Sequence, residues 1–154
     1  MKCFDSQVAQ WYEVVVHDHS FLGGKFVAKF IIEVSSFIGA NKLVFEDLSG
    51  ANILEMMELG ESRPHNIKDI IGVIDGVVQF DWCNFYLFSN NLIVPTQEQQ
   101  YPEIIVNTIA TIRAIDDAEL YLYTKNRRLV NHIVNCYKNN SVIKNVLDAF
   151  VYPE

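Results

Sequence analysis

The densest group of possible metal ligands in the sequence is the segment "HDH" at residues 17–19. In an extended strand His17 and His19 point to the same face, and that spacing can chelate a transition metal. Two ligands are one short of a catalytic site, and His65 and His132 have no readable relation to the pair. We therefore expect a structural role for these histidines, and neither a metal ion nor another cofactor.

A second group of reactive side chains lies in "IRAIDDAELYLYTKNRR". Paired carboxylates can bind a cation or divide acid and base roles, and a basic helix start can hold an anion. The same residue types are ordinary in turns, helix caps and surface ion pairs. A small enzyme or ligand-binding domain therefore stays an alternative, using either His17 and His19 or the cluster formed by Asp116, Asp117, Arg127 and Arg128.

Motifs for nucleophilic, phosphate-binding and metal chemistry are absent from the sequence. It contains no nucleophile elbow, no GxGxxG, no GxxxxGK[ST], no HExxH and no EF-hand loop. Cys3, Cys83 and Cys136 form no CxxC pair and have no histidine at zinc-finger spacing, which indicates idle thiols in a reducing compartment. These absences favour a protein that is not an enzyme.

The charge of the chain favours a protein partner over a nucleic acid. The formal net charge is −7 and the isoelectric point is near 5.0, so the chain repels phosphate backbones. Residues 46–61 hold five acids, no base, and the apolar residues of "ILEMME". Apolar anchors ringed by carboxylates suit a basic partner. The predicted partner-binding residues are Glu46, Asp47, Glu55, Glu58, Glu61 and Asp81.

Length and composition predict a single folded domain over residues 1–154. Half of the 154 residues are hydrophobic and a fifth are charged, which is enough apolar material for a real core. The start "MKCFDSQVAQ" lacks the apolar region of a secretory signal, and no apolar run reaches the roughly 20 residues of a bilayer span. We expect a cytoplasmic protein that does not associate with membranes.

The first third of the chain reads as an antiparallel β-hairpin or meander. Gly23 and Gly24 can form a two-residue turn, and both flanks of "WYEVVVHDHSFLGGKFVAKFIIEVSS" are rich in β-branched and aromatic residues. A helix over residues 26–38 is the rival interpretation, because Phe26, Phe30 and Val34 fall at helical spacing. "NKLVFEDLSG" is predicted as a third strand.

The rest of the chain predicts an aromatic strand followed mainly by helices. "VVQFDWCNFYLF" is typical of a strand that lies mostly in the core, with Cys83-Asn84 as a possible bulge. Helices are predicted from Pro102 to Ile115, from Asn126 to Asn140 and from Ser141 to Phe150, with a strand at 118–124. The predicted fold is therefore α+β, with a central aromatic strand covered by C-terminal helices.

Size, charge and missing motifs together predict a small acidic protein-binding module. The class that fits is an immunity or antitoxin type of inhibitor, which in bacteria would occlude the active site of a basic, nuclease-like toxin with carboxylates. A further alternative is an oligomeric role in which the aromatic strand pairs across a symmetry axis.

Overall fold

A seven-stranded antiparallel sheet organises the protein, with strand order β3-β2-β4-β5-β6-β1-β7. This computed structural model describes residues 11–17, 23–89, 108–116 and 119–138, and the backbone of 141–147. The elements are β1 (Trp11–His17), α1 (Gly23–Ile38), β2 (Lys42–Ala51), α2 (Leu54–Leu59), β3 (His65–Asn66), α3 (Ile67–Asp75), β4 (Gln79–Phe88), β5 (Ala110–Ile115), β6 (Glu119–Thr124), α5 (Arg127–Cys136) and β7 (Ser141–Leu147). The α+β class is confirmed.

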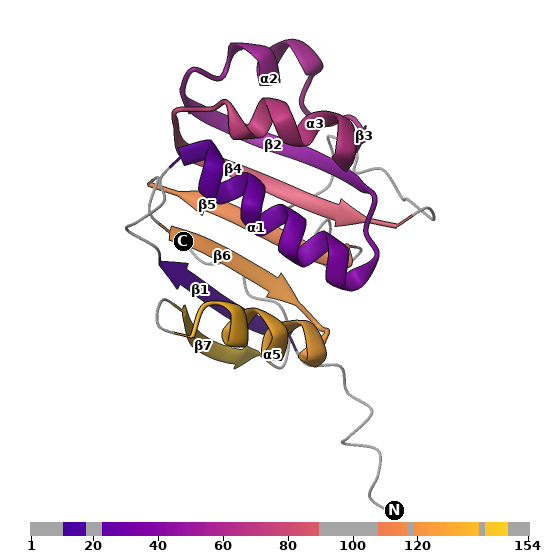
Figure 1. Cartoon of the computed structure of the whole chain (residues 1–154), viewed down its shortest axis with the longest axis vertical. Coiled ribbons are helices and arrows are strands. Elements are labelled where there is room, and N and C mark those ends of the chain that lie inside the picture. The colour runs from indigo at the N-terminus through magenta and orange to yellow at the C-terminus, as the bar shows by residue number, and fades with distance from the viewer. Residues whose placement is uncertain (1–10, 18–22, 90–107, 117–118, 139–140, 148–154) are drawn as a thin grey trace, which may run out of the picture.

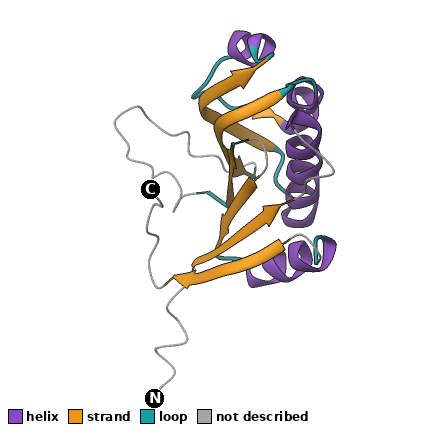
Figure 2. Cartoon of the chain, turned by 90° about the vertical axis from the view of Figure 1, so that its left-hand side faces the viewer, coloured by secondary structure: helices purple, strands orange, loops and turns teal. Residues whose placement is uncertain are grey.

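The helices lie on one face of the sheet, as Figures 1 and 2 show. α1 packs beside α3, and α5 lies over the β6-β1-β7 end. α2 lies at the opposite end, next to β2. The covering helices therefore come from both halves of the chain: α5 is one of the predicted C-terminal helices, whereas α1, α2 and α3 precede β4.

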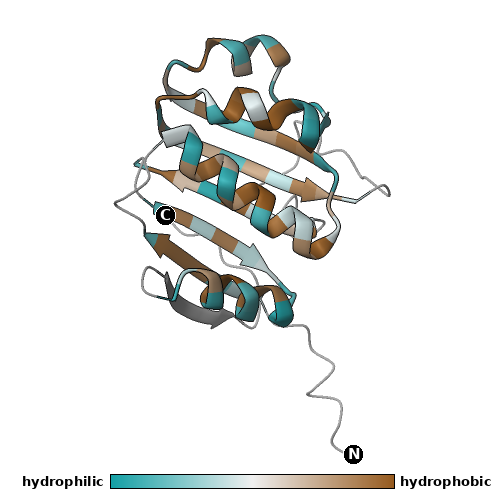
Figure 3. Cartoon of the chain, viewed as in Figure 1, coloured by the Kyte–Doolittle hydropathy of each residue, from teal (hydrophilic) through white to brown (hydrophobic). Residues whose placement is uncertain are grey.

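The predicted hairpin turn at Gly23-Gly24 is wrong, because these residues begin α1. The alternative prediction of a helix over residues 26–38 is confirmed. Its apolar residues Phe26, Phe30 and Val34 are all fully buried against the sheet. Figure 3 shows the resulting alternation of apolar and polar faces along α1. β1 pairs with β6 and β7 instead, and the predicted hairpin register does not exist.

The two glycines serve close packing instead of a turn. A Cβ on Gly23 would lie 2.1 Å from the carbonyl oxygen of Val78, and one on Gly24 would lie 2.0 Å from that of Ile74. Gly23 also has φ +67, which glycine adopts without strain. The start of α1 therefore touches the backbone that links α3 to β4.

The aromatic strand β4 runs inside the sheet between β2 and β5, as predicted for a core strand. Ser49 pairs with Trp82 while Gly50 pairs with Phe80, so Asp81 is an extra residue that forms a bulge. The bulge switches the faces of β4 two residues before the predicted Cys83-Asn84 position. Because both edges of β4 are already paired, it cannot pair with a second copy of the chain.

Two predicted C-terminal helices are strands in the structure. Residues 110–115 form β5, in which Ala110, Ile112 and Ala114 face the helices and alternate with Thr111 and Arg113 on the other face. Ile109, Ile112 and Ile115 recur every third residue, which is why the segment resembled a helical stripe. Residues 141–147 form β7, and the predicted helical residues 102–107 and 148–150 lie outside the described part.

The remaining predicted elements are confirmed. β2 and β6 occupy the predicted segments, and α5 begins after Asn126, whose side-chain oxygen accepts a hydrogen bond from the Leu129 amide at 3.0 Å. No helix within the described ranges is long and apolar enough to cross a membrane.

Candidate functional site

Three of the predicted partner-binding carboxylates converge at one place on β2. Glu61 Oε1 accepts a hydrogen bond from the Leu48 amide at 3.1 Å, and Glu46 Oε2 accepts one from the Ser62 hydroxyl at 2.6 Å. Asp47 follows Glu46 in the chain and has φ 60. It lies where the register of the β2–β4 pairing shifts, between Glu46 and Ser49. We call Glu46, Asp47 and Glu61 the β2 carboxylates.

The β2 carboxylates repel one another. Burial raises the pKa of Glu46, with further increases from the charges of Asp47 and Glu61 and an opposing effect from the Ser62 hydrogen bond. Burial and the Glu61 charge likewise raise the pKa of Asp47, against the hydrogen bond from Asn84 and the charge of Arg113. The ionised forms of Glu46 and Asp47 are therefore disfavoured in these surroundings, and a nearby cation would favour them.

A buried polar connection anchors the β2 carboxylates to the sheet. The Asn84 amide donates to Asp47 Oδ2 at 3.2 Å, and its Oδ1 accepts from Arg113 Nε at 3.1 Å. Asn84 and Arg113 are each about 1% exposed, and the guanidinium lies 4.5 Å from the Trp82 ring centroid. This connection fixes the orientation of Asp47 through two rigid central strands.

The same face of the sheet continues into a second polar contact. Tyr123 donates its hydroxyl hydrogen to Glu13 Oε2 at 2.6 Å, and both side chains are buried. Burial, the Glu13 hydrogen bond and the Glu13 charge raise the pKa of Tyr123, so the phenol stays protonated. The contact joins β1 to β6, where Glu13 and Tyr123 lie opposite each other.

The short helix α2 presents apolar side chains among acids. Met56 is fully buried, whereas Leu54 is 64% exposed and Met57 is 56% exposed. Glu55 and Glu58 are exposed on the same helix. A small pocket of about 200 Å³ lies beside α2, lined by Asn52, Leu54, Glu55, Met56, Gly72, Val73 and Gly76. The apolar residues of "ILEMME" therefore comprise one core residue, one partly buried residue, Ile53, and two exposed residues.

Asp81, the sixth predicted partner-binding residue, is exposed at the β4 bulge. Its Oδ1 accepts a hydrogen bond from the Gln79 side chain at 2.7 Å. The bulge places it across from Ser49 and Gly50 of β2.

The alternative acid–base cluster does not assemble in the described part of the chain. Asp116 lies at the turn before β6, whereas Arg127 and Arg128 begin α5 after β6. The six residues of β6 span about 20 Å, which separates the acid from the bases. Asp117 lies outside the described residues.

In the described part of the chain, His17 of "HDH" belongs to no group of three possible metal ligands. His17 Nδ1 lies 3.4 Å from Glu119 Oε2, across the β1–β6 register. His19 lies outside the described residues.

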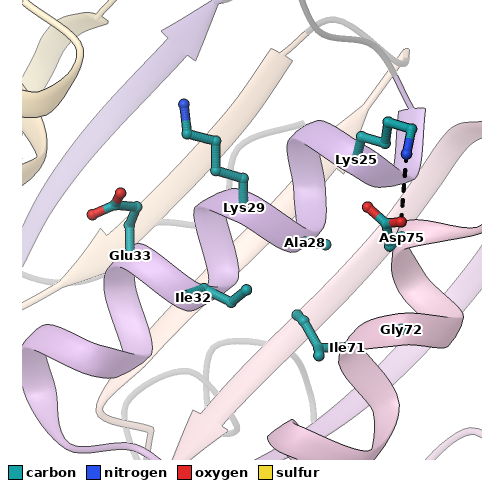
Figure 4. A pocket seen from close by; sticks show the side chains of 8 residues that line it. All are labelled: Lys25, Ala28, Lys29, Ile32, Glu33, Ile71, Gly72 and Asp75. Atoms are coloured by element: carbon teal, nitrogen blue, oxygen red, sulfur yellow. Dashed lines mark ion pairs between the residues drawn. The ribbon is translucent and has the colours of Figure 1, made fainter.

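A shallow groove runs between α1 and α3 (Figure 4). Its volume is about 390 Å³, and Ala28, Ile32 and Ile71 supply its apolar surface. Lys25 Nζ and Asp75 Oδ2, 3.6 Å apart, close one end. An adjoining hollow of about 570 Å³ shares Ile32 and Ile71. The groove holds no set of convergent polar groups that would define a small-molecule site.

One compact set of possible metal ligands joins α1 to α5. Glu33 comes from α1, and His132 and Cys136 come from successive turns of α5; their ligand atoms lie within 4.8 Å of one another. Sequence inspection missed this set. The i, i+4 spacing of His132 and Cys136 was a usable signal, because it puts both side chains on one helix face. Glu33 lies 99 positions earlier and had no such signal.

No family model, curated protein or solved structure matches the chain. Evidence on function therefore comes from the geometry and charge of these surfaces.

Proposed function

We propose that the protein is an acidic binding module that inhibits a basic protein partner. The observation that carries the proposal is the convergence of the β2 carboxylates, where burial, and after it the charges of neighbouring carboxylates, raises the pKa of Glu46 and Asp47. A lysine or arginine of a partner placed among them would lower both pKa values and remove the repulsion. Carboxylates arranged in this way also imitate the charge of a phosphate backbone.

The exposed anchors of α2 supply the apolar part of the same proposed surface. Leu54 and Met57 would fill hollows of the partner, while Glu55 and Glu58 contact its basic rim. Flexible methionine side chains adapt to an irregular partner surface. Binding would thus combine long-range attraction by the carboxylates with short-range packing by α2.

A narrower form of the proposal is that the partner is a nuclease-like toxin and the protein is an immunity or antitoxin type of inhibitor. Its support is the charge of −7, the base-free segment 46–61 and the absence of catalytic motifs from the sequence. The inhibitor would cover the toxin's active site with carboxylates in place of the substrate's phosphates.

The test begins with the product of the gene next to the one that encodes this chain. That product is purified, and its binding and its nuclease activity are measured with and without the protein. We expect binding and inhibition by the wild type. A combined Glu46→Lys, Asp47→Lys and Glu61→Lys variant should lose most of both. Lys68→Glu/Asp69→Lys, a charge swap on the exposed side of α3, is the control and should behave as wild type.

Two results would contradict the proposal at different levels. Binding without inhibition of any nuclease would remove the narrower form and leave the binding module. Equal binding by the wild type and the triple variant would remove the role of the β2 carboxylates.

A further inference from the structure

We propose that Glu33, His132 and Cys136 form a binding site for a zinc-class divalent metal ion between α1 and α5. The three side chains offer the carboxylate, imidazole and thiolate ligands that Zn²⁺ uses in proteins. The site is separate from the proposed partner surface, because α5 and α2 lie at opposite ends of the sheet (Figure 1).

The distances fit a tetrahedral ion. Cys136 Sγ lies 3.6 Å from His132 Nε2 and 3.9 Å from Glu33 Oε2, and His132 Nε2 lies 3.7 Å from Glu33 Oε2. With Zn–S of about 2.3 Å and Zn–N or Zn–O of about 2.0–2.1 Å, tetrahedral angles require about 3.6 Å from sulfur and about 3.4 Å between nitrogen and oxygen. The three donors thus form one face of a coordination tetrahedron with little adjustment.

The same distances argue against a Cys-His-Glu catalytic triad. In a triad the two ring nitrogens of the histidine contact different partners, so that the acid orients the base. Here the thiol and the carboxylate both approach Nε2 of His132. Convergence on one point is the geometry of ligation.

Neighbouring residues hold the ligands in place. The Phe37 ring stacks on His132 with centroids 4.5 Å apart and an interplanar angle of 17°, which fixes the imidazole plane. Figure 4 shows Glu33 pointing from α1 away from α3. Lys29 Nζ lies 5.7 Å from the ring centroid of Tyr137, the residue next to Cys136 in the chain. Cys136 is exposed, so the fourth position opens to water or an external ligand.

The test uses the purified full chain and Zn²⁺ or Co²⁺ alone. Equilibrium dialysis with elemental analysis should give one Zn²⁺ per chain. Bound Co²⁺ should show a thiolate-to-cobalt charge-transfer band and intense tetrahedral d–d bands. Cys136→Ser should abolish the charge-transfer band. His132→Gln and Glu33→Gln should weaken binding by more than the roughly 10–100-fold that loss of an outer-shell partner costs.

Control variants and a second readout keep the proposal open to refutation. His17→Gln removes a histidine that also contacts a carboxylate, Glu119, and should bind Zn²⁺ as wild type does. Zn²⁺ should raise the melting temperature of the wild type, but not of Cys136→Ser, whose fold is checked by circular dichroism. Absence of stoichiometric binding to the wild type would overturn the proposal. The proposal would also be overturned if Cys136→Ser and His132→Gln each bound Zn²⁺ as tightly as the wild type does.

Discussion

At the scale of single residues, partly buried charges on β2 oppose folding. The folded-state pKa of Glu46 lies above its ordinary value of 4.5, so its ionised form is disfavoured in the folded protein. For an acid with a raised pKa, stability is greatest at low pH and is lost as pH rises through that pKa. The partner surface and the stability of the free protein are therefore in conflict, as is common at binding sites.

Glu46→Gln should raise the melting temperature at pH 7, because the amide keeps an acceptor for Ser62 and removes the repelled charge. The gain should shrink as pH falls below about 4.5, where the glutamate of the unfolded chain is itself protonated. Thermal unfolding at both pH values measures the effect. Glu58→Gln on the exposed face of α2 is the control; an equal gain at both pH values would refute the charge explanation.

Removal of the buried guanidinium of Arg113 should destabilise the sheet. Arg113→Met fills much of the same space but leaves the Asn84 carbonyl oxygen without its donor, at a cost of roughly 1–3 kcal/mol. Urea unfolding measures this cost. Arg63→Met, at an exposed residue, should stay within about 0.5 kcal/mol of the wild type. A similar small change for Arg113→Met would mean that the connection to Asp47 contributes little.

At the scale of elements, the join between α1 and the α3–β4 link depends on glycine. Gly24→Ala should lower stability by about 1–3 kcal/mol, because its methyl group would overlap the Ile74 carbonyl and force the backbones apart. Gly72→Ala is the matched control, since a Cβ there meets nothing within 4 Å and alanine favours a helix by up to about 1 kcal/mol. Chemical denaturation should show a lower free energy of unfolding for Gly24→Ala and a higher one for Gly72→Ala. Destabilisation of both variants would contradict the packing explanation.

The elements that the sequence predicted correctly are those whose local signals agree with their tertiary places. Asn126 caps α5, and the alternation of "ELYLYT" survives in β6. The errors have different physical causes. In β5, Ile109, Ile112 and Ile115 recur every third residue, and this spacing resembles a helical stripe although the segment is a strand. Gly23-Gly24 was wrongly predicted as a turn, because a glycine pair that lets two backbone segments approach closely has the same sequence as one that forms a turn.

The candidate sites were predictable to different degrees. The acidic segment 46–61 was visible as charge, but the sequence did not reveal that Glu46, Asp47 and Glu61 meet while Met56 turns inward. Likewise His132 and Cys136 share a helix face by spacing alone, whereas Glu33 reaches them only through the packing of α1 on α5. Contacts between elements distant in sequence decide both sites.

At the scale of the whole molecule, the two ends of the sheet have different proposed roles. α2 and the β2 carboxylates lie at one end, and the metal ligands of α5 lie at the other. The proposed partner surface combines charge, which acts at long range, with the exposed Leu54 and Met57, which act only on contact. These contributions affect different rate constants, because charge mainly sets the association rate constant and packing mainly sets the dissociation rate constant.

Leu54→Ala combined with Met57→Ala should therefore leave the association rate with the partner nearly unchanged and raise the dissociation rate more than tenfold. Both side chains are exposed in the free protein, so the substitutions should not affect folding. Surface plasmon resonance separates the two rates. Ile32→Ala, at an exposed apolar residue of the α1–α3 groove, is the matched control. An unchanged dissociation rate would exclude α2 from the contact.

The central claim, that the β2 carboxylates steer a basic partner to this surface, is tested most directly by the association rate constant as a function of ionic strength. For the wild type it should be high at low salt and fall steeply as salt screens the charges. The Glu46→Lys, Asp47→Lys and Glu61→Lys variant should associate several-fold more slowly at low salt, with a flat or reversed salt dependence. Identical rate constants and salt dependence for the two proteins would contradict the account.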